Sequence, residues 1–115
     1  MSRSQPERHA PLTDHAAVFA ALGDATRLSL IGRLADGPPQ SISRLAEGSA
    51  LTRQAITKHL RVLEGAGVVR SIRAGRENLF VFRPEPIREI RSYLDRVSAH
   101  WDDALGRLKA FVEKS

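Results

Sequence analysis

The sequence feature that most restricts the fold is a periodic row of apolar residues in the last quarter of the chain. The row recurs every three or four residues over about seven helical turns. Its members are Ile87, Ile90, Leu94, Val97, Trp101, Leu105, Leu108 and Val112. Pro84 and Pro86 precede it, and proline suits the first turn of a helix, where its missing N–H would be unpaired anyway. We therefore predict one long helix over about 85–112 with an apolar stripe along it.

A chain of 115 residues is long enough for a single core. The short helices of so small a domain cannot cover a stripe of this length. The alternative is that the long helix folds back on its own core, but its length argues against full burial within one chain. We therefore expect part of the stripe to contact a second copy.

A second helical pattern lies in the middle of the chain, at 51–67. Ile56, Leu60 and Leu63 line one apolar face because they recur at helical spacing. Thr52 is predicted to cap the start of this helix, and Gly65 to end it in the left-handed conformation. The remaining surface carries side chains that reach phosphates and base edges, namely Arg53, Gln54, Thr57, Lys58 and Arg61.

Shorter helices precede this central helix. A first one starts at Asp14, and Asp24 caps a second, which the glycine and prolines at 37–39 end. Ser41 caps a short third helix. A turn containing Gly48 then joins the third helix to the central one, which predicts a helix-turn-helix over about 41–65.

Two runs rich in β-branched and aromatic residues follow, at 68–73 and 78–82, with a glycine between them at the tip. A helix-turn-helix followed by such a hairpin is a winged helix. The predicted fold is therefore mainly α (α+β), with a wing at about 68–83. Arg73 and Arg76 would reach the DNA backbone or the minor groove. The alternative is a hairpin that carries ordinary solvated arginines.

The positive charge is concentrated in one window. Between Gln40 and Arg76 there are seven basic residues and two acidic ones, whereas the two signs balance on either side, so the net charge of +5 sits around the central helix. This asymmetry predicts double-stranded DNA as a partner, because nucleic-acid affinity comes mainly from phosphates neutralised by Lys and Arg. Solubility alone would not require the charge to gather around one helix.

Other classes of protein find little support. There is no cysteine, no glycine-rich phosphate loop and no metal-ligand cluster, and the four histidines are scattered, so we expect neither an enzyme nor a cofactor. No apolar run is long enough to cross a bilayer, and the first dozen residues lack the apolar stretch of a secretory signal. We expect a cytoplasmic protein without membrane contact, with a mobile arm at 1–12 and a single domain at 13–112.

Three stretches resemble the ArsR/SmtB family of bacterial winged-helix repressors. They are Ala-Leu-Gly-Asp-Ala-Thr-Arg-Leu at 21–28, Ala-Ile-Thr-Lys-His-Leu at 55–60 and Leu-Glu-Gly-Ala-Gly-Val-Val at 63–69, and Gly75-Arg76 matches the family's wing tip. The resemblance covers about 14–112. It implies a homodimer, joined through the first and last helices, that binds a palindromic operator near a promoter and blocks transcription. The residues assigned to this dimer contact are Val18, Phe19, Leu22, Ile90, Leu94, Val97, Trp101, Leu105 and Leu108.

The chain departs from the family at informative positions. Ala25 stands where proline is usual, and the thiolate motif of metal-sensing members is absent because there is no cysteine. The final helix carries His100 and several acids without the spacing of zinc sensors. His100 is therefore either a polar residue beside the dimer contact or a metal ligand, and no metal site is assigned. No effector is identified; a small organic ligand, a protein partner and the absence of any ligand all stay open.

The DNA-contacting side chains divide by position. Arg53 and Gln54, at the amino end of the central helix, are best placed for guanine and adenine edges, followed by Thr57 and Lys58. His59 either donates to a phosphate or packs against the protein. The complete predicted set is Ser41, Arg44, Thr52, Arg53, Gln54, Thr57, Lys58, His59, Arg61, Arg73 and Arg76. The alternative functions are nonspecific architectural DNA binding and a winged helix used for protein contacts.

Overall fold

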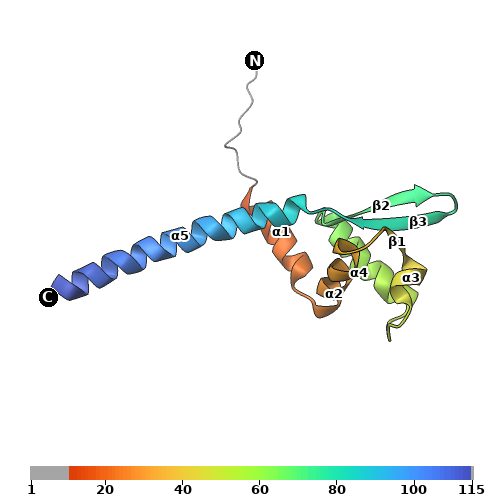
Figure 1. The fold of residues 1–115 in the computed structure, drawn as a ribbon, viewed down its shortest axis with the longest axis horizontal. Helices are drawn as coiled ribbons and strands as arrows, with labels where there is room; N and C mark the ends of the chain where they lie inside the picture. Colours follow the sequence, from red (N-terminus) through yellow and green to blue (C-terminus); the bar gives the residue numbers. More distant parts are fainter. Residues whose placement is uncertain (1–10, 115) are drawn as a thin grey trace, which may run out of the picture.

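The computed structural model describes residues 11–114. Within them the elements are α1 (Leu12–Leu22), α2 (Ala25–Ala35), β1 (Gln40–Ser41), α3 (Ile42–Ala46), α4 (Arg53–Gly65), β2 (Val69–Ala74), β3 (Glu77–Phe82) and α5 (Glu85–Lys114). Figure 1 shows α1 to α4 gathered together, with the hairpin on one side and α5 projecting on the other. The predicted fold, a winged helix-turn-helix with a long final helix, is confirmed.

Three short polar side chains start three of the helices. The Asp24 carboxylate, the Ser41 hydroxyl and the Thr52 hydroxyl each accept a hydrogen bond from the backbone N–H three residues on, at 3.0–3.1 Å. These bonds satisfy N–H groups that have no partner within the helix. All three predicted caps are confirmed.

Two predicted helix ends differ from the structure. α1 begins at Leu12, two residues before the predicted start at Asp14 and inside the predicted arm of 1–12, of which residues 1–10 lie outside the described residues. The prediction that Gly65 adopts the left-handed conformation was wrong, because Gly65 is still helical and Gly67 has the positive φ of 78°. The left-handed conformation is found at Gly67 because its N–H donates to the carbonyl oxygen of Glu64 at 2.9 Å and closes the last turn of the helix.

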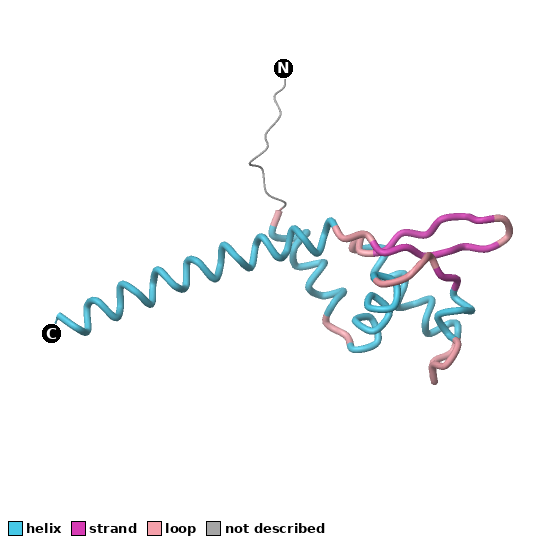
Figure 2. Tube along the Cα trace, viewed as in Figure 1, coloured by secondary structure: helices cyan, strands magenta, loops and turns pink. Residues whose placement is uncertain are grey.

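The strands form an antiparallel sheet in the order β1-β3-β2. β2 and β3 pair from Val69 opposite Phe82 to Ala74 opposite Glu77, and form the extended hairpin of Figure 2. The two residues of its tip include Gly75 with a φ of 63°, a conformation that glycine adopts without strain. β1 was not predicted, because a strand of two residues shows no periodicity.

The core is built from every helix and from the hairpin. Its buried apolar residues are Val18, Ala21, Leu30, Leu34, Leu45, Ile56, Leu60, Leu63, Val68, Val69, Phe80 and Ile90. Ile56, Leu60 and Leu63 are at most 1% exposed, which confirms the predicted apolar face of α4 and directs its opposite face to the surface. Among the described residues, no helix combines the length and the apolar character needed to span a bilayer.

Candidate nucleic-acid interface

The turn between α3 and α4 exposes the amino end of α4. Gly48 has a φ of 74°, which turns the chain sharply after α3. The Ser49 hydroxyl then accepts from the N–H of Leu51 at 3.0 Å, and Thr52 caps α4. The helix-turn-helix predicted from the turn residues is therefore present, and its second helix starts at the surface.

The exposed face of α4 carries the predicted base-reading residues. Gln54 and Lys58 are exposed on the side opposite the buried face of the helix, Arg53 is exposed at its first position, and Thr57 is half-buried. A shallow hollow beside the amino end of α4 brings the side chains of 52–58 together with Ile42 of α3. The residues that line it are Ile42, Thr52, Arg53, Gln54, Ala55, Thr57 and Lys58. Five of the eleven predicted contact residues thus line one hollow.

The hydroxyl of Thr57 is already engaged within the helix. Its Oγ1 donates to the carbonyl oxygen of Arg53 at 2.8 Å. Its hydrogen is therefore committed, so the side chain offers only its oxygen lone pairs and its methyl group to a ligand. Such a residue is suited to a thymine methyl or to a donor group.

Arg61 joins a small network between α4 and the hairpin. Its Nη1 lies 3.4 Å from Oε1 of Glu64, and Oε2 of the same carboxylate accepts from the hydroxyl of Ser71 in β2 at 3.0 Å. The Arg61 side chain is still 69% exposed. It can approach a phosphate, but its charge is partly balanced by Glu64.

The predicted wing arginines lie at the far end of the hairpin. Arg73 ends near the tip, where its Nε donates to the carbonyl oxygen of Gly75 at 3.2 Å, and Arg76 occupies the turn itself. Both residues are exposed. The hairpin therefore presents two cations at its tip.

At the start of α3, Ser41 and Arg44 have different surroundings. Ser41 is half-buried and its hydroxyl is used as the helix cap, whereas the Arg44 side chain is exposed. The carboxyl end of α3 is held by Arg33 of α2, which donates to the carbonyl oxygens of Leu45 at 2.6 Å and of Arg44 at 3.1 Å. Sequence reasoning did not single out Arg33.

His59 contacts the protein through its Nδ1. This atom lies 3.3 Å from Nη1 of Arg27 and 3.7 Å from Oδ2 of Asp24, both at the start of α2. The backbone N–H of Arg27 is the main cause that lowers the pKa of the Asp24 carboxyl below its ordinary value; desolvation opposes this effect, and the charge of Arg27 adds to the lowering. Sequence reasoning missed Arg27, although the residue lies in the first stretch of the family resemblance.

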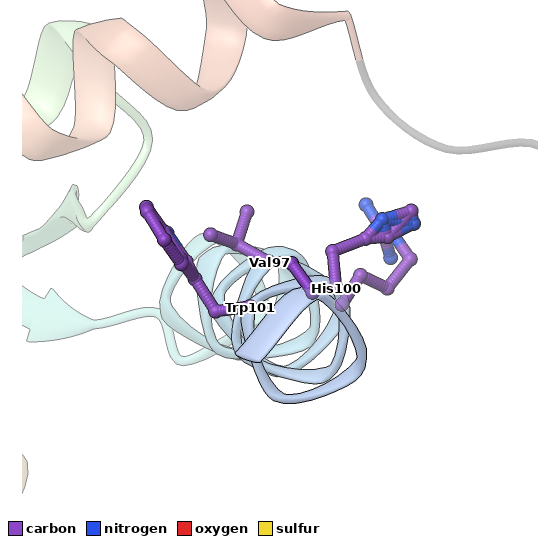
Figure 3. A pocket seen from close by; sticks show the side chains of 5 residues that line it. Val97, His100 and Trp101 are labelled. Carbon is purple, nitrogen blue, oxygen red and sulfur yellow. The ribbon is translucent and has the colours of Figure 1, made fainter. Parts of the chain in front are cut away.

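The residues predicted to form the dimer contact divide into three groups by exposure. Val18 and Ile90 are buried in the core, whereas Phe19, Leu94, Trp101, Leu105 and Leu108 are exposed and Leu22 and Val97 are intermediate. In Figure 3, Val97 lies between Trp101 and His100 on one face of α5. No cluster of three or more potential metal ligands occurs within residues 11–114.

The comparisons with known proteins agree with this geometry. A family described as "Helix-turn-helix domain" matches residues 22–72. YuzN of Bacillus subtilis (strain 168), an uncharacterized HTH-type transcriptional regulator, is 38% identical over 80 residues, which cover 64% of this chain and 87% of YuzN.

Two solved structures show the same architecture. An ArsR-like transcriptional regulator from Rhodococcus sp. RHA1 is 37% identical, with 87% of this chain and 93% of that chain covered at a TM-score of 0.78. The homodimeric winged helix-turn-helix DNA-binding domain of Mb0332 from Mycobacterium bovis shares the fold at 20% identity and a TM-score of 0.62, with 81% of this chain and 85% of that chain covered.

The helix-turn-helix, its exposed basic helix and its relatives define a DNA-binding transcriptional regulator rather than an enzyme. Within this class, the chain belongs to the ArsR family of winged helix-turn-helix regulators. The family resemblance found in the sequence is confirmed.

Proposed function

We propose that the chain is a homodimeric repressor in which two α4 helices enter successive major grooves of an inverted-repeat operator. The observation that carries this proposal is the position of Arg53, Gln54 and Lys58 on the exposed face of a helix whose other face is anchored in the core. A helix with this division of faces fits the width of the major groove. We assign the protein to the cytoplasm, where a bacterial operator is accessible.

The apolar face of α5 supports the dimer. Leu94, Trp101 and Leu105 are 48%, 63% and 54% exposed, and Leu108 and Val112 continue the row toward the carboxyl end. Such a continuous apolar row is unusual on a monomer in water and marks an interaction surface. α1 has 11 residues against 30 in α5, so it covers only part of this face. A second α5 is the partner of matching length, and the Mycobacterium bovis relative is itself described as homodimeric.

The roles within the DNA contact follow from position. We assign sequence reading to Arg53 and Gln54, with Thr57 and Lys58 beside them, because bidentate side chains at the amino end of such a helix meet base edges. We also assign the ammonium group of Lys58 a contact with a neighbouring phosphate. The contacts to the DNA backbone or to the adjacent minor groove are assigned to Arg44, Arg61, Arg73 and Arg76. His59, which sequence reasoning left open, is assigned a different role below.

The positive charge and the two-fold symmetry of the dimer determine how binding depends on salt and how far apart the two α4 helices lie. If four or five basic residues of each protomer meet phosphates, the dimer neutralises about eight to ten, and log K falls with log[salt] with a slope of about −7 to −9. The two α4 helices enter the same side of the duplex when they are about 34 Å apart, which is one helical turn of DNA. The α5 pairing sets that distance.

The proposal is tested by selecting genomic fragments with the purified full chain and footprinting the enriched ones. The expected result is protection of a short inverted repeat at a promoter, lost in Arg53→Ala, with reduced transcription from that promoter in a reconstituted assay. Lys109→Ala is the matched control, because Lys109 lies in α5 away from α4. Uniform coating of any duplex would establish architectural binding instead, and protection of none would establish a protein-interaction module.

A further inference from the structure

Arg27, near the start of α2, spans the junction of three helices. Its Nε donates to the carbonyl oxygen of Ala21 at 2.6 Å, and its Nη2 donates to that of Ala20 at 3.3 Å, both in the last turn of α1. Its Nη1 lies 3.3 Å from Nδ1 of His59, in the middle of α4. One guanidinium thus contacts both α1 and the DNA-reading helix.

We propose that Arg27 and His59 are positioning residues that fix the angle between α1 and α4 and thereby set operator affinity without touching DNA. This inference rests on the proposed function, in which α5 pairs the two protomers and α4 enters the groove, and α1 packs against α5. Where these helices meet, the angle between α1 and α4 determines the separation of the two DNA-reading helices in the dimer. An error in this angle displaces both from their grooves.

The hydrogen bond with Arg27 defines which ring nitrogen of His59 carries the proton. A guanidinium only donates, so Nδ1 of His59 accepts from Arg27 and the neutral imidazole carries its proton on Nε2. The charged groups that face this ring are the Arg27 guanidinium and the Asp24 carboxylate, both from α2, and the carboxylate balances the arginine's charge. From α1 the same guanidinium meets only carbonyl oxygens. A donation from His59 to a phosphate through Nδ1 is therefore excluded in this arrangement.

Arginine suits this junction better than any other cation. The last carbonyl groups of a helix lack partners and carry the negative end of the helix dipole, so a cation there is favourable. The planar guanidinium presents several N–H groups in a rigid fork, which lets one side chain meet two helices in fixed directions. A lysine at the same position supplies the charge without the fork.

The inference makes a prediction that separates positioning from DNA contact. Losing a phosphate contact weakens binding and also reduces the salt slope, because fewer counterions are released. Losing a positioning residue weakens binding and leaves the slope unchanged. A residue needed only for folding reduces the fraction of active protein and leaves the affinity of the active molecules unchanged.

The experiment measures affinity of the full chain for its selected duplex by fluorescence anisotropy over a salt series, after the active fraction has been titrated with excess protein and duplex. We expect His59→Leu and Arg27→Gln to weaken binding about tenfold at an unchanged salt slope. His59→Asn should bind within about twofold of the wild type, because the amide oxygen of asparagine lies close to the position of Nδ1 and accepts from Arg27. Arg88→Gln, an exposed arginine of α5, is the control and should leave both quantities unchanged.

Two results would overturn the inference. One is a reduced salt slope in His59→Leu or Arg27→Gln, which would make these residues phosphate contacts. The other is wild-type affinity among the active molecules of His59→Leu, which would leave it only a structural role. Either result, with a wild-type protein that still protects its operator, leaves the proposed function intact. A wild-type protein that selects no duplex refutes the proposed function itself.

Discussion

Replacing Lys58 by alanine gives the most direct test of the DNA-binding surface. Lys58 is exposed on α4 and lines the hollow at its amino end. A dimer carries the residue twice, so Lys58→Ala removes two cations from the complex. With a slope change of about 0.9 for each phosphate contact, the salt slope should become shallower by about 1.8, from about −8 to about −6.

The assay is equilibrium binding to the selected duplex at several salt concentrations between about 50 and 200 mM. Over that range the wild-type affinity should fall by roughly five orders of magnitude, and that of Lys58→Ala by roughly four. Lys109→Ala removes the same charge from α5 and should follow the wild-type line. A Lys58→Ala slope equal to that of the wild type, or an equal change in the Lys109→Ala control, would refute the assignment of the DNA face to α4.

Three further predictions concern the dimer and the stability of the fold. Trp101→Asp should produce monomers in sedimentation-velocity experiments and abolish operator protection, because it puts a charge into the apolar face of α5; an unchanged dimer would contradict the proposed pairing. Thr52→Ala should lower the free energy of unfolding by about 1 kcal/mol in chemical denaturation, since the cap of α4 is lost. Folding lowers the pKa of Asp24 below its ordinary 3.8, chiefly through the N–H of Arg27. The ionised carboxylate therefore stabilises the fold above pH 3.8, and this stabilisation is lost as the pH falls through the folded-state pKa. The stability difference between the wild type and Asp24→Asn should therefore narrow on acidification below about pH 4, and a difference independent of pH would count against the Asp24 contact.

Local chemistry explains what the sequence could predict. Thr52 and Asp24 cap helices through N–H groups only three residues away, so the outcome depends on the neighbouring chain alone. The hairpin could also be predicted from the sequence, because β2 and β3 are joined by a two-residue tip that contains a glycine. The apolar face of α4 followed from helical spacing. These features involve no long-range contact.

Two features of the structure were not predicted correctly from the sequence. The left-handed conformation after α4 was assigned to the wrong glycine, because Gly65 and Gly67 lie close together and spacing alone does not show which of them closes the last turn. The contact of Arg27 with His59 joins residues 32 positions apart. Helical periodicity does not indicate which side chain of one helix will contact another helix. Arg27 therefore entered the sequence analysis only as one of the basic residues whose charge is balanced within 1–39.

The short strand β1 has a mechanical consequence for DNA reading. Ser41, which caps α3, pairs with Leu79 of the hairpin, and Ser71 of β2 donates a hydrogen bond to Glu64 of α4, so the hairpin is joined to the helix-turn-helix at both α3 and α4. Rotation of the hairpin relative to the helices would break both bonds at once. The two parts should therefore approach DNA as one rigid body, and the spacing between the base pairs under α4 and the flanking base pairs under the hairpin tip should tolerate no insertion.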